Sequence, residues 1–218
     1  MLATSLNSGL GAFLEALAAF AIIVLVCLPI HEFGHAWAAV KLGDNLPLSQ
    51  GRYTLNPLQH LDVFGTLLLA VAGFGWAKPV QFNPYALRKA PNLRIGVLLV
   101  SLAGPAMNVL LAVLAAIPFR LGLVSVRDII SDQPLAMILF ILLSINLLLA
   151  VFNMIPVPPL DGSKVLAMLL PANYDNVMAT LNQYGMILLL IMIVPIGGES
   201  LISRITTPVV MSLTRFLL

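Results

Sequence analysis

The sequence predicts an all-α polytopic membrane protein with about 4–6 transmembrane helices and a re-entrant or short β-hairpin segment between the first and second spans. Hydrophobic residues make up 60% of the 218 residues and charged residues only 9%, whereas a soluble domain carries about 25% charged residues. Several uncharged stretches are long enough to cross about 30 Å of hydrocarbon as helices. A stretch rich in glycine and proline separates the first two of them.

Four spans are expected. The first is apolar over residues 16–30, and its helical pattern continues to Leu42, where Gly43 can end it. The other three are the uncharged stretches 95–119, 135–160 and 176–198. Residues 201–218 are a weaker candidate, because Arg204 and Arg215 flank a short apolar piece.

The segment between the first two spans, about residues 43–94, differs from the rest. Its apolar run from Val63 to Ala77 is short and glycine-rich for a crossing. We interpret the segment as re-entrant, with short strands near Leu67–Ala72 and Ala77–Phe82. Irregular backbone at membrane depth is tolerated only where protein or water covers it. The segment is therefore expected to pack against the helices and to line a cavity.

Charge and basic residues predict the surroundings of the chain. The net charge of +2 indicates no nucleic-acid partner. Residues 1–12 contain no Lys or Arg, so the first span is expected to be retained rather than cleaved as a signal. Alternation of the spans places Arg120, Arg127 and Arg204 on one side and a larger set on the other: Lys41, Arg52, Lys78, Arg88, Lys89, Arg94 and Lys164. The larger set is expected to face the cytoplasm, in the cell membrane of a prokaryote.

The residues His31-Glu32-Phe33-Gly34-His35 form an H-E-x-x-H motif. Four residues turn a helix by about 400°, so both imidazoles project from one face and can share one tetrahedral ion. Glu32 is then placed to act as general base toward a metal-activated water. The alternative is a pair of core histidines with a buried, ion-paired glutamate. It is disfavoured because ionisable groups inside a span are costly and usually functional.

A catalytic zinc ion usually has three protein ligands and one open position. The candidates for the third ligand are His60, Asp62, Asp161 and Glu199. Asp161 is preferred, because three prolines break the helix just before it and the alternation of spans puts it at the depth of the motif. Its alternative role is the N-cap of a helix over residues 162–170. His60 remains open between a role near the metal, a gate and an interfacial position, and Asp62 is also suited to cap the turn that follows it.

These residues resemble the site-2 protease family of intramembrane zinc metalloproteases. The resemblance rests on H-E-F-G-H in an early span and on the downstream pattern Asn153-x-x-Pro156-x-x-x-Leu160-Asp161-Gly162. Three further stretches resemble motifs of the family, so that the likeness covers roughly residues 20–170: Ser101 to Asn108, Asn56 to Asp62 and Gly75 to Val80.

The resemblance implies one Zn²⁺ per chain, held by His31, His35 and Asp161. It also implies two catalytic residues, Glu32 as the base and Asn153 as a donor to the oxyanion. Local capping of the broken helix is the alternative for Asn153. We expect one metalloprotease domain over 1–218 with the following parts: a catalytic core at about 14–172, the re-entrant segment at about 43–94 and C-terminal helices at about 176–218. Many members carry a PDZ domain or a CBS pair; the sequence shows no such insert and resembles the minimal branch.

The expected function is hydrolysis of peptide bonds within or near the transmembrane segments of single-span proteins, which reach the site from the lipid bilayer. An intramembrane metal transporter is less favoured, because spans 95–119 and 176–198 offer almost no polar path. A non-catalytic relative that binds membrane proteins is disfavoured because ligands, base and oxyanion residue are all present. A zinc peptidase for soluble substrates is disfavoured as well, because it would need a cleft in an extramembrane domain and the sequence shows no such domain. The sequence predicts neither the natural substrate nor the oligomeric state.

Overall fold

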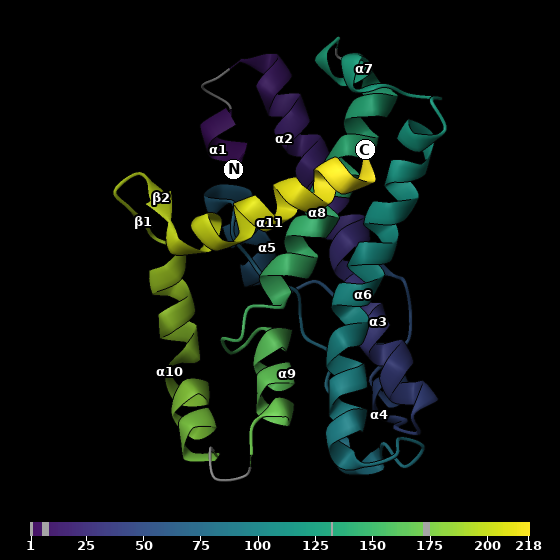
Figure 1. The fold of residues 1–218 in the computed structure, drawn as a ribbon, viewed down its shortest axis with the longest axis vertical. Helices are drawn as coiled ribbons and strands as arrows, with labels where there is room; N and C mark the ends of the chain where they lie inside the picture. The colour runs from purple at the N-terminus through teal and green to yellow at the C-terminus, as the bar shows by residue number, and fades with distance from the viewer. Residues whose placement is uncertain (1, 6–8, 132, 172–174) are drawn as a thin grey trace.

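The computed structural model describes residues 2–5, 9–131, 133–171 and 175–218, and nearly all of its regular structure is helical (Figure 1). In chain order the elements are α1 (Leu2–Ser5), α2 (Leu10–Ile22), η2 (Ile23–Cys27), α3 (Leu28–Lys41), α4 (Leu46–Ser49), η3 (Pro57–Gln59), α5 (Val63–Ala72), η4 (Pro84–Ala86), α6 (Leu93–Arg120), α7 (Val126–Ile130), α8 (Pro134–Asn153), α9 (Asp161–Leu169), α10 (Asp175–Ile193), β1 (Pro195–Ile196), β2 (Glu199–Ser200) and α11 (Leu201–Leu217).

Four of the described helical segments are long and apolar enough to cross a membrane. Their lengths are 32, 28, 20 and 18 residues, for Leu10–Lys41, Leu93–Arg120, Pro134–Asn153 and Asn176–Ile193. At a rise of about 1.5 Å per residue, even the shortest nearly spans the hydrocarbon core. Each of the four expected spans corresponds to such a helix, and these helices indicate an integral membrane protein. The third ends at Asn153 and the fourth at Ile193, before the ends of the uncharged stretches 135–160 and 176–198. The weaker candidate, residues 201–218, forms α11, which runs across the bundle instead of along it (Figure 1).

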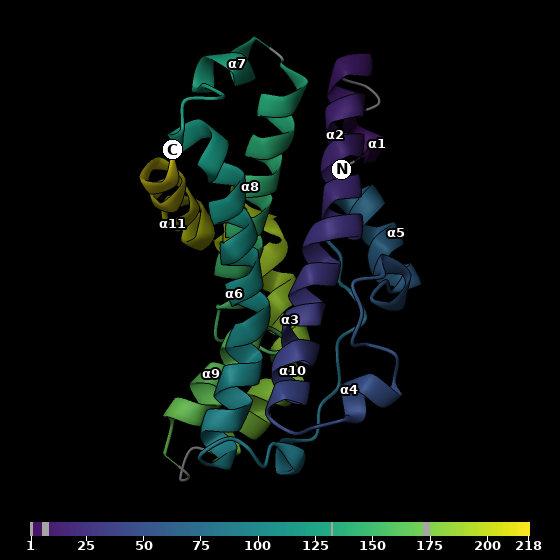
Figure 2. The same cartoon turned by 90° about the vertical axis from the view of Figure 1, so that its right-hand side faces the viewer.

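Helix α6 packs against both α3 and α8, and it lies between them in the view of Figure 2. Small side chains at both contacts let the backbones approach closely: Ala38 and Ala39 face α6 from α3, and Ala112, Ala115 and Ala116 face α8 from α6. Successive spans run in opposite directions, so that α4 and α9 lie at one end of the molecule and α7 at the other (Figure 1). The prediction that most basic residues lie on one side of the membrane depends on this alternation.

Helix α2 passes into α3 through a π-helical turn, Ile23–Cys27. The Leu28 N–H bonds to the carbonyl of Ile23, five residues earlier. Pro29 follows at once and has no N–H to continue a regular ladder. Single π turns inside α-helices often adjoin functional sites, and this one directly precedes the helix that carries the H-E-x-x-H motif.

The predicted β-hairpin between the first two spans is wrong. Residues 43–94 are all described, and their one β contact is a bridge between Leu61 and Ala77. The strand expected at Leu67–Ala72 is part of helix α5. Asp62 caps this helix by accepting from Gly65 N–H at 2.8 Å, and Gly73 ends it in the left-handed region at φ 76°. Capped at both ends, the apolar run satisfies its own backbone hydrogen bonds, which an isolated hairpin cannot do at membrane depth.

Polar contacts hold together the irregular chain on either side of α5. Lys78 N–H donates to the carbonyl of His60 at 2.8 Å. The buried guanidinium of Arg52 donates to the carbonyls of Gln59 and Lys78. The strand expected at Ala77–Phe82 is therefore a length of irregular backbone held against the protein, with pairing limited to the single bridge at Ala77.

Candidate metal centre

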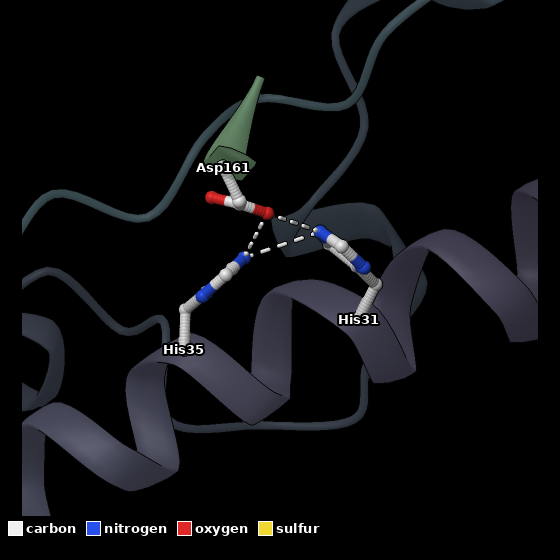
Figure 3. Close-up of side chains that lie close together, drawn as sticks. All are labelled: His31, His35 and Asp161. Atoms are coloured by element: carbon white, nitrogen blue, oxygen red, sulfur yellow. Dashed lines mark hydrogen bonds and ion pairs between the residues drawn. The ribbon is translucent and has the colours of Figure 1, made fainter. Parts of the chain in front are cut away.

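Three side chains with ligand atoms converge from two distant parts of the chain (Figure 3). His31 and His35 lie one turn apart on α3, and their Nε2 atoms are 3.1 Å from each other. Asp161 Oδ2, from the first residue of α9, lies 3.2 Å from His31 Nε2 and 3.1 Å from His35 Nε2. All three residues are buried. Within the described part of the chain, they are the one group of His, Cys and acidic residues placed to hold a metal ion together.

The distances between these atoms fit a tetrahedral zinc site. Zn–N and Zn–O bonds of about 2.0–2.2 Å put two tetrahedral ligand atoms about 3.3–3.6 Å apart. The three observed separations of 3.1–3.2 Å are slightly shorter and nearly equal. Small outward shifts of the side chains would accommodate an ion, with the fourth position open.

The hydrogen bonds behind the histidines also fit a metal. His31 Nδ1 is 2.6 Å from Asn108 Oδ1, and His35 Nδ1 is 2.7 Å from the carbonyl oxygen of Val100. Both partners are acceptors, so each Nδ1 donates, and each neutral imidazole presents an unprotonated Nε2 to the carboxylate. Three acceptors that face one point require positive charge there, which a metal ion supplies.

Asp161 reaches this position because α8 ends before it. The connection between α8 and α9 contains Pro156, Pro158 and Pro159, which cannot donate backbone hydrogen bonds to a continuing helix. Gly162 lies so close to the carbonyl of Met154 that a Cβ there would overlap it. The alternative role of Asp161 as an N-cap is not what the structure shows, because the N-cap position is Leu160 and the carboxylate faces the histidines.

Glycine at position 104 of α6 makes room for the imidazoles. A Cβ at Gly104 would overlap His35 Nε2 and lie 2.6 Å from His35 Cε1 and 2.8 Å from His31 Cε1. On α3, between the two histidines, a Cβ at Gly34 would lie 2.7 Å from the carbonyl oxygen of Ala103. The position of the two imidazoles therefore depends on the close approach of α3 and α6, which glycine allows at both positions.

Glu32 is buried, with 8% of its surface exposed. Its Oε2 accepts a hydrogen bond from Val80 N–H at 2.8 Å. This contact fixes one carboxylate oxygen and joins the motif helix to the irregular backbone that follows α5. The candidate base is therefore held by the re-entrant segment.

Lys164 contacts the carboxylate oxygen of Asp161 that faces away from the histidines. Its Nζ lies 3.3 Å from Asp161 Oδ1 and 5.8 Å from the centre of the Phe82 ring. The neighbouring ammonium favours the ionised form of the carboxylate. In that form Asp161 can act as a metal ligand.

Replacing Lys164 by Met is expected to weaken zinc binding by less than about 10-fold, because the ammonium orients Asp161 but is 43% exposed and screened by solvent. Competition with a chromophoric chelator measures the change. Lys41→Met, which removes an exposed ammonium at the end of α3, is the matched control. A loss of 100-fold or more would mean that Lys164 is required for the metal, which this geometry does not predict.

The other candidates for the third ligand lie elsewhere in the structure. His60 is fully buried, and its Nε2 bonds to the carbonyl of Thr54 at 2.7 Å. Asp62 caps α5. Glu199 is exposed and pairs with Arg204 at 4.0 Å. His60 therefore joins two parts of the re-entrant segment, and its proposed roles as gate or metal neighbour gain no support from these contacts.

Asn153 is the last residue of α8, and its Nδ2 donates to the carbonyl of Leu149 in the same helix at 2.9 Å. The side chain is half-buried. This is the local contact expected of the capping alternative. Its role toward an oxyanion stays a prediction, because that role requires the amide to leave Leu149.

Sequence reasoning did not assign roles to several residues that shape the site. Asn108 belongs to a stretch recognised only by its family likeness, and Gly104 was interpreted only as a small residue suited to close helix contact. The contacts made by the backbones of Val100 and Val80 carry no side-chain signal. The one available signal for Asn108 was its polar amide within the uncharged span 95–119, since buried polar groups in membranes usually have a partner or a function.

A model of peptidase family M50 matches residues 120–193. The chain is also 38% identical over 180 residues to the "Putative zinc metalloprotease YwhC" of Bacillus subtilis (strain 168), and the match covers 81% of each protein. The chain belongs to peptidase family M50. It is therefore an M50 metallopeptidase, and the resemblance to the site-2 protease family is confirmed.

Other M50 relatives are more distant and longer. The chain is 31% identical over 174 residues to the "Putative zinc metalloprotease Rip2" of Mycobacterium tuberculosis (strain ATCC 25618 / H37Rv), covering 77% of this chain and 63% of that protein. It is 26% identical over 159 residues to the "Zinc metalloprotease MJ0392" of Methanocaldococcus jannaschii, covering 73% of this chain and 36% of that protein. No solved structure matches the chain significantly.

Proposed function

We propose that this M50 peptidase cleaves peptide bonds within or near the transmembrane segments of single-span membrane proteins, using one zinc ion held by His31, His35 and Asp161. One observation carries the proposal: two of the three buried candidate ligands, His31 and His35, lie on a helix that is long and apolar enough to cross the membrane. A hydrolytic site at that depth acts on substrates that are themselves in the bilayer.

The chain's residues divide the chemistry between them. Zinc, when bound, polarises a peptide carbonyl and lowers the pKa of water toward about 7. Glu32 takes the proton of the attacking water on its carboxylate and returns it to the leaving amine. Val80 N–H keeps the Glu32 carboxylate oriented between these transfers. Asn153, once released from Leu149, donates to the developing oxyanion.

The irregular backbone of residues 77–82 is the proposed place where a substrate lies in extended form. A helical substrate hides its carbonyls in its own hydrogen bonds, so it must unwind before cleavage. Val80 lies in direct contact with Glu32, and a substrate backbone there would pass beside the base. The concentration of basic residues at the end of the molecule that holds α4 and α9 supports a site toward the cytoplasm.

Zinc content and cleavage of a panel of single-span substrates in liposomes test the proposal. Wild-type protein is expected to hold about one zinc per chain and to cleave, and Asp161→Ala is expected to lose both, since two histidines alone leave a weak site. Glu199→Ala, an exposed carboxylate removed elsewhere, is the matched control.

Other outcomes would contradict the proposal. Zinc in the wild type with no cleavage of any substrate would indicate a metal-dependent binder of membrane proteins. Zinc flux into liposomes without cleavage would indicate a transporter. Stoichiometric zinc in Asp161→Ala would reject Asp161 as the third ligand.

A further inference from the structure

A chain of buried amides connects the metal site to α8. Asn108 on α6 and Asn146 on α8 are both fully buried, and Asn108 Nδ2 donates to Asn146 Oδ1 at 2.7 Å. Asn146 Nδ2 donates in turn to the carbonyl of Leu142 at 2.8 Å and contacts Cys27 Sγ at 3.2 Å. Asn108 Oδ1 is the atom that bonds to His31 Nδ1. Three helices thus meet through two asparagine side chains behind one candidate ligand.

The carbonyl of Leu142, at the end of this series of hydrogen bonds farthest from His31, sets the direction of each of them. A backbone carbonyl can only accept, so Leu142 requires the amino group of Asn146 to face it. Asn146 must then present its oxygen to Asn108, whose amino group faces that oxygen. Asn108 Nδ2 also lies 3.4 Å from the carbonyl of Cys27, which fixes the same direction. The oxygen of Asn108 is therefore left for His31 Nδ1.

This direction decides whether His31 can bind a metal. An oxygen at Nδ1 holds the imidazole proton there and leaves the Nε2 lone pair free. If the Asn108 amide were reversed, its amino group would face Nδ1, and the neutral ring would carry its proton on Nε2. A ring in that form points an N–H at the ion and cannot be a ligand.

We propose that Asn146 is a positioning residue for the metal centre, acting through Asn108 to fix the tautomer of His31. The inference rests on the proposed ligand set and is independent of which substrate the enzyme cleaves. Neither asparagine touches the reacting atoms. Their contribution is to the affinity for zinc.

The test exploits the difference between an amide and a carboxylate at position 108. Asn146→Leu is expected to weaken zinc binding about 10-fold, within the range of 10–100-fold known for groups that orient metal ligands, because Asn108 is then held only by the longer contact to Cys27. An aspartate carboxylate at position 108 has two equivalent oxygens, so either orientation of the group presents an acceptor to His31 Nδ1. In the Asn108→Asp background, Asn146→Leu is therefore expected to change zinc affinity by less than about 3-fold, which amounts to rescue.

Zinc affinity is measured by chelator competition in detergent, with the apo protein's thermal unfolding recorded for each variant. At saturating cobalt(II), Asn146→Leu is expected to give the ligand-field spectrum of the wild type, because its ligands are unchanged. Thr206→Val removes a fully buried hydroxyl that bonds only within α11 and is the matched control, with no expected change in affinity. Asn146→Ser serves as a milder variant if Asn146→Leu does not fold.

Three results would overturn the inference: an equal loss of affinity from Asn146→Leu in both backgrounds, no loss in either, or the same loss in Thr206→Val. Each of them indicates that Asn146 acts only in packing or not at all. Failure of the proposed ligand set gives a different result, since wild-type protein would then bind no zinc. Failure of the proposed cleavage alone leaves the expected zinc affinities unchanged.

Discussion

Glu32→Gln is expected to lower cleavage of a membrane substrate by about 10²–10⁴-fold, the usual contribution of a general base, and to leave about one zinc per chain bound. The amide cannot accept the proton of the attacking water. It retains an oxygen for Val80 N–H, which the carboxylate accepts at 2.8 Å, so the surrounding contacts remain. Product formation by gel or mass spectrometry, together with metal analysis of the same preparation, gives both quantities.

Glu15→Gln is the matched control for this change, because it alters the same side chain at an exposed position of the same membrane-long helix. It is expected to cleave at the wild-type rate. Cleavage near the wild-type rate by zinc-loaded Glu32→Gln would show that Glu32 is not the base. Loss of zinc from that variant would instead assign Glu32 a role in holding the metal.

Gly104→Ala is expected to lower zinc affinity by at least about 100-fold and to abolish cleavage. The added methyl would overlap His35 Nε2 and crowd the Cε1 atoms of both histidines. Either the imidazoles turn away from the ion or α6 moves away from α3, and both changes open the ligand triangle. Overpacking of this kind costs about 1–3 kcal/mol or more. Zinc titration and thermal unfolding measure the two effects.

Gly11→Ala is a suitable control, because a Cβ there meets nothing within 4 Å and Gly11 lies at the start of the span that carries the two histidines. It is expected to keep zinc and to be slightly more stable, since Ala is favoured over Gly in a helix by about 1 kcal/mol. Normal zinc affinity in Gly104→Ala would show that α3 and α6 yield without cost, contrary to the close approach described above.

The sequence predicted the spans well because their signal is strong. Long uncharged stretches have few alternatives in lipid, and the H-E-x-x-H motif needs only helical periodicity for both histidines to face one point. Asp161 was harder, because its carboxylate is equally suited to cap a helix. The prolines before it made an inward turn reasonable, and the structure brings it to the histidines.

The re-entrant segment was predicted less well for a physical reason. Its residues between Asp62 and Gly73 were interpreted as containing a strand, because glycine and a short apolar run are as common in hairpins as in short membrane helices. The two caps decide between these structures, and each of them acts only once the helix exists. Hydrogen bonds such as Val80 N–H to Glu32 come from backbone atoms that every residue has, so no residue type announces them.

The α11 helix shows the same limit. Its apolar residues are interrupted by Arg204, Thr206 and Arg215, and length alone left a crossing open. In the structure the last carbonyls of α11 accept from the guanidinium of Arg120 at the end of α6. That contact fixes the helix across the bundle, and it joins residues almost a hundred positions apart, beyond the reach of local patterns.

The carboxylates of Asp161 and Glu32 are both buried, and the ammonium of Lys164 is only partly so. Without a divalent cation this region carries excess negative charge where solvation is poor and Coulomb repulsion is strong. One Zn²⁺ makes the sum of ion and carboxylates neutral, so metal loading and stable insertion into the bilayer are coupled equilibria. Cells short of zinc are therefore expected to hold less of this protein, not an equal amount of an intact but silent form, and its steady-state level under chelation is the readout.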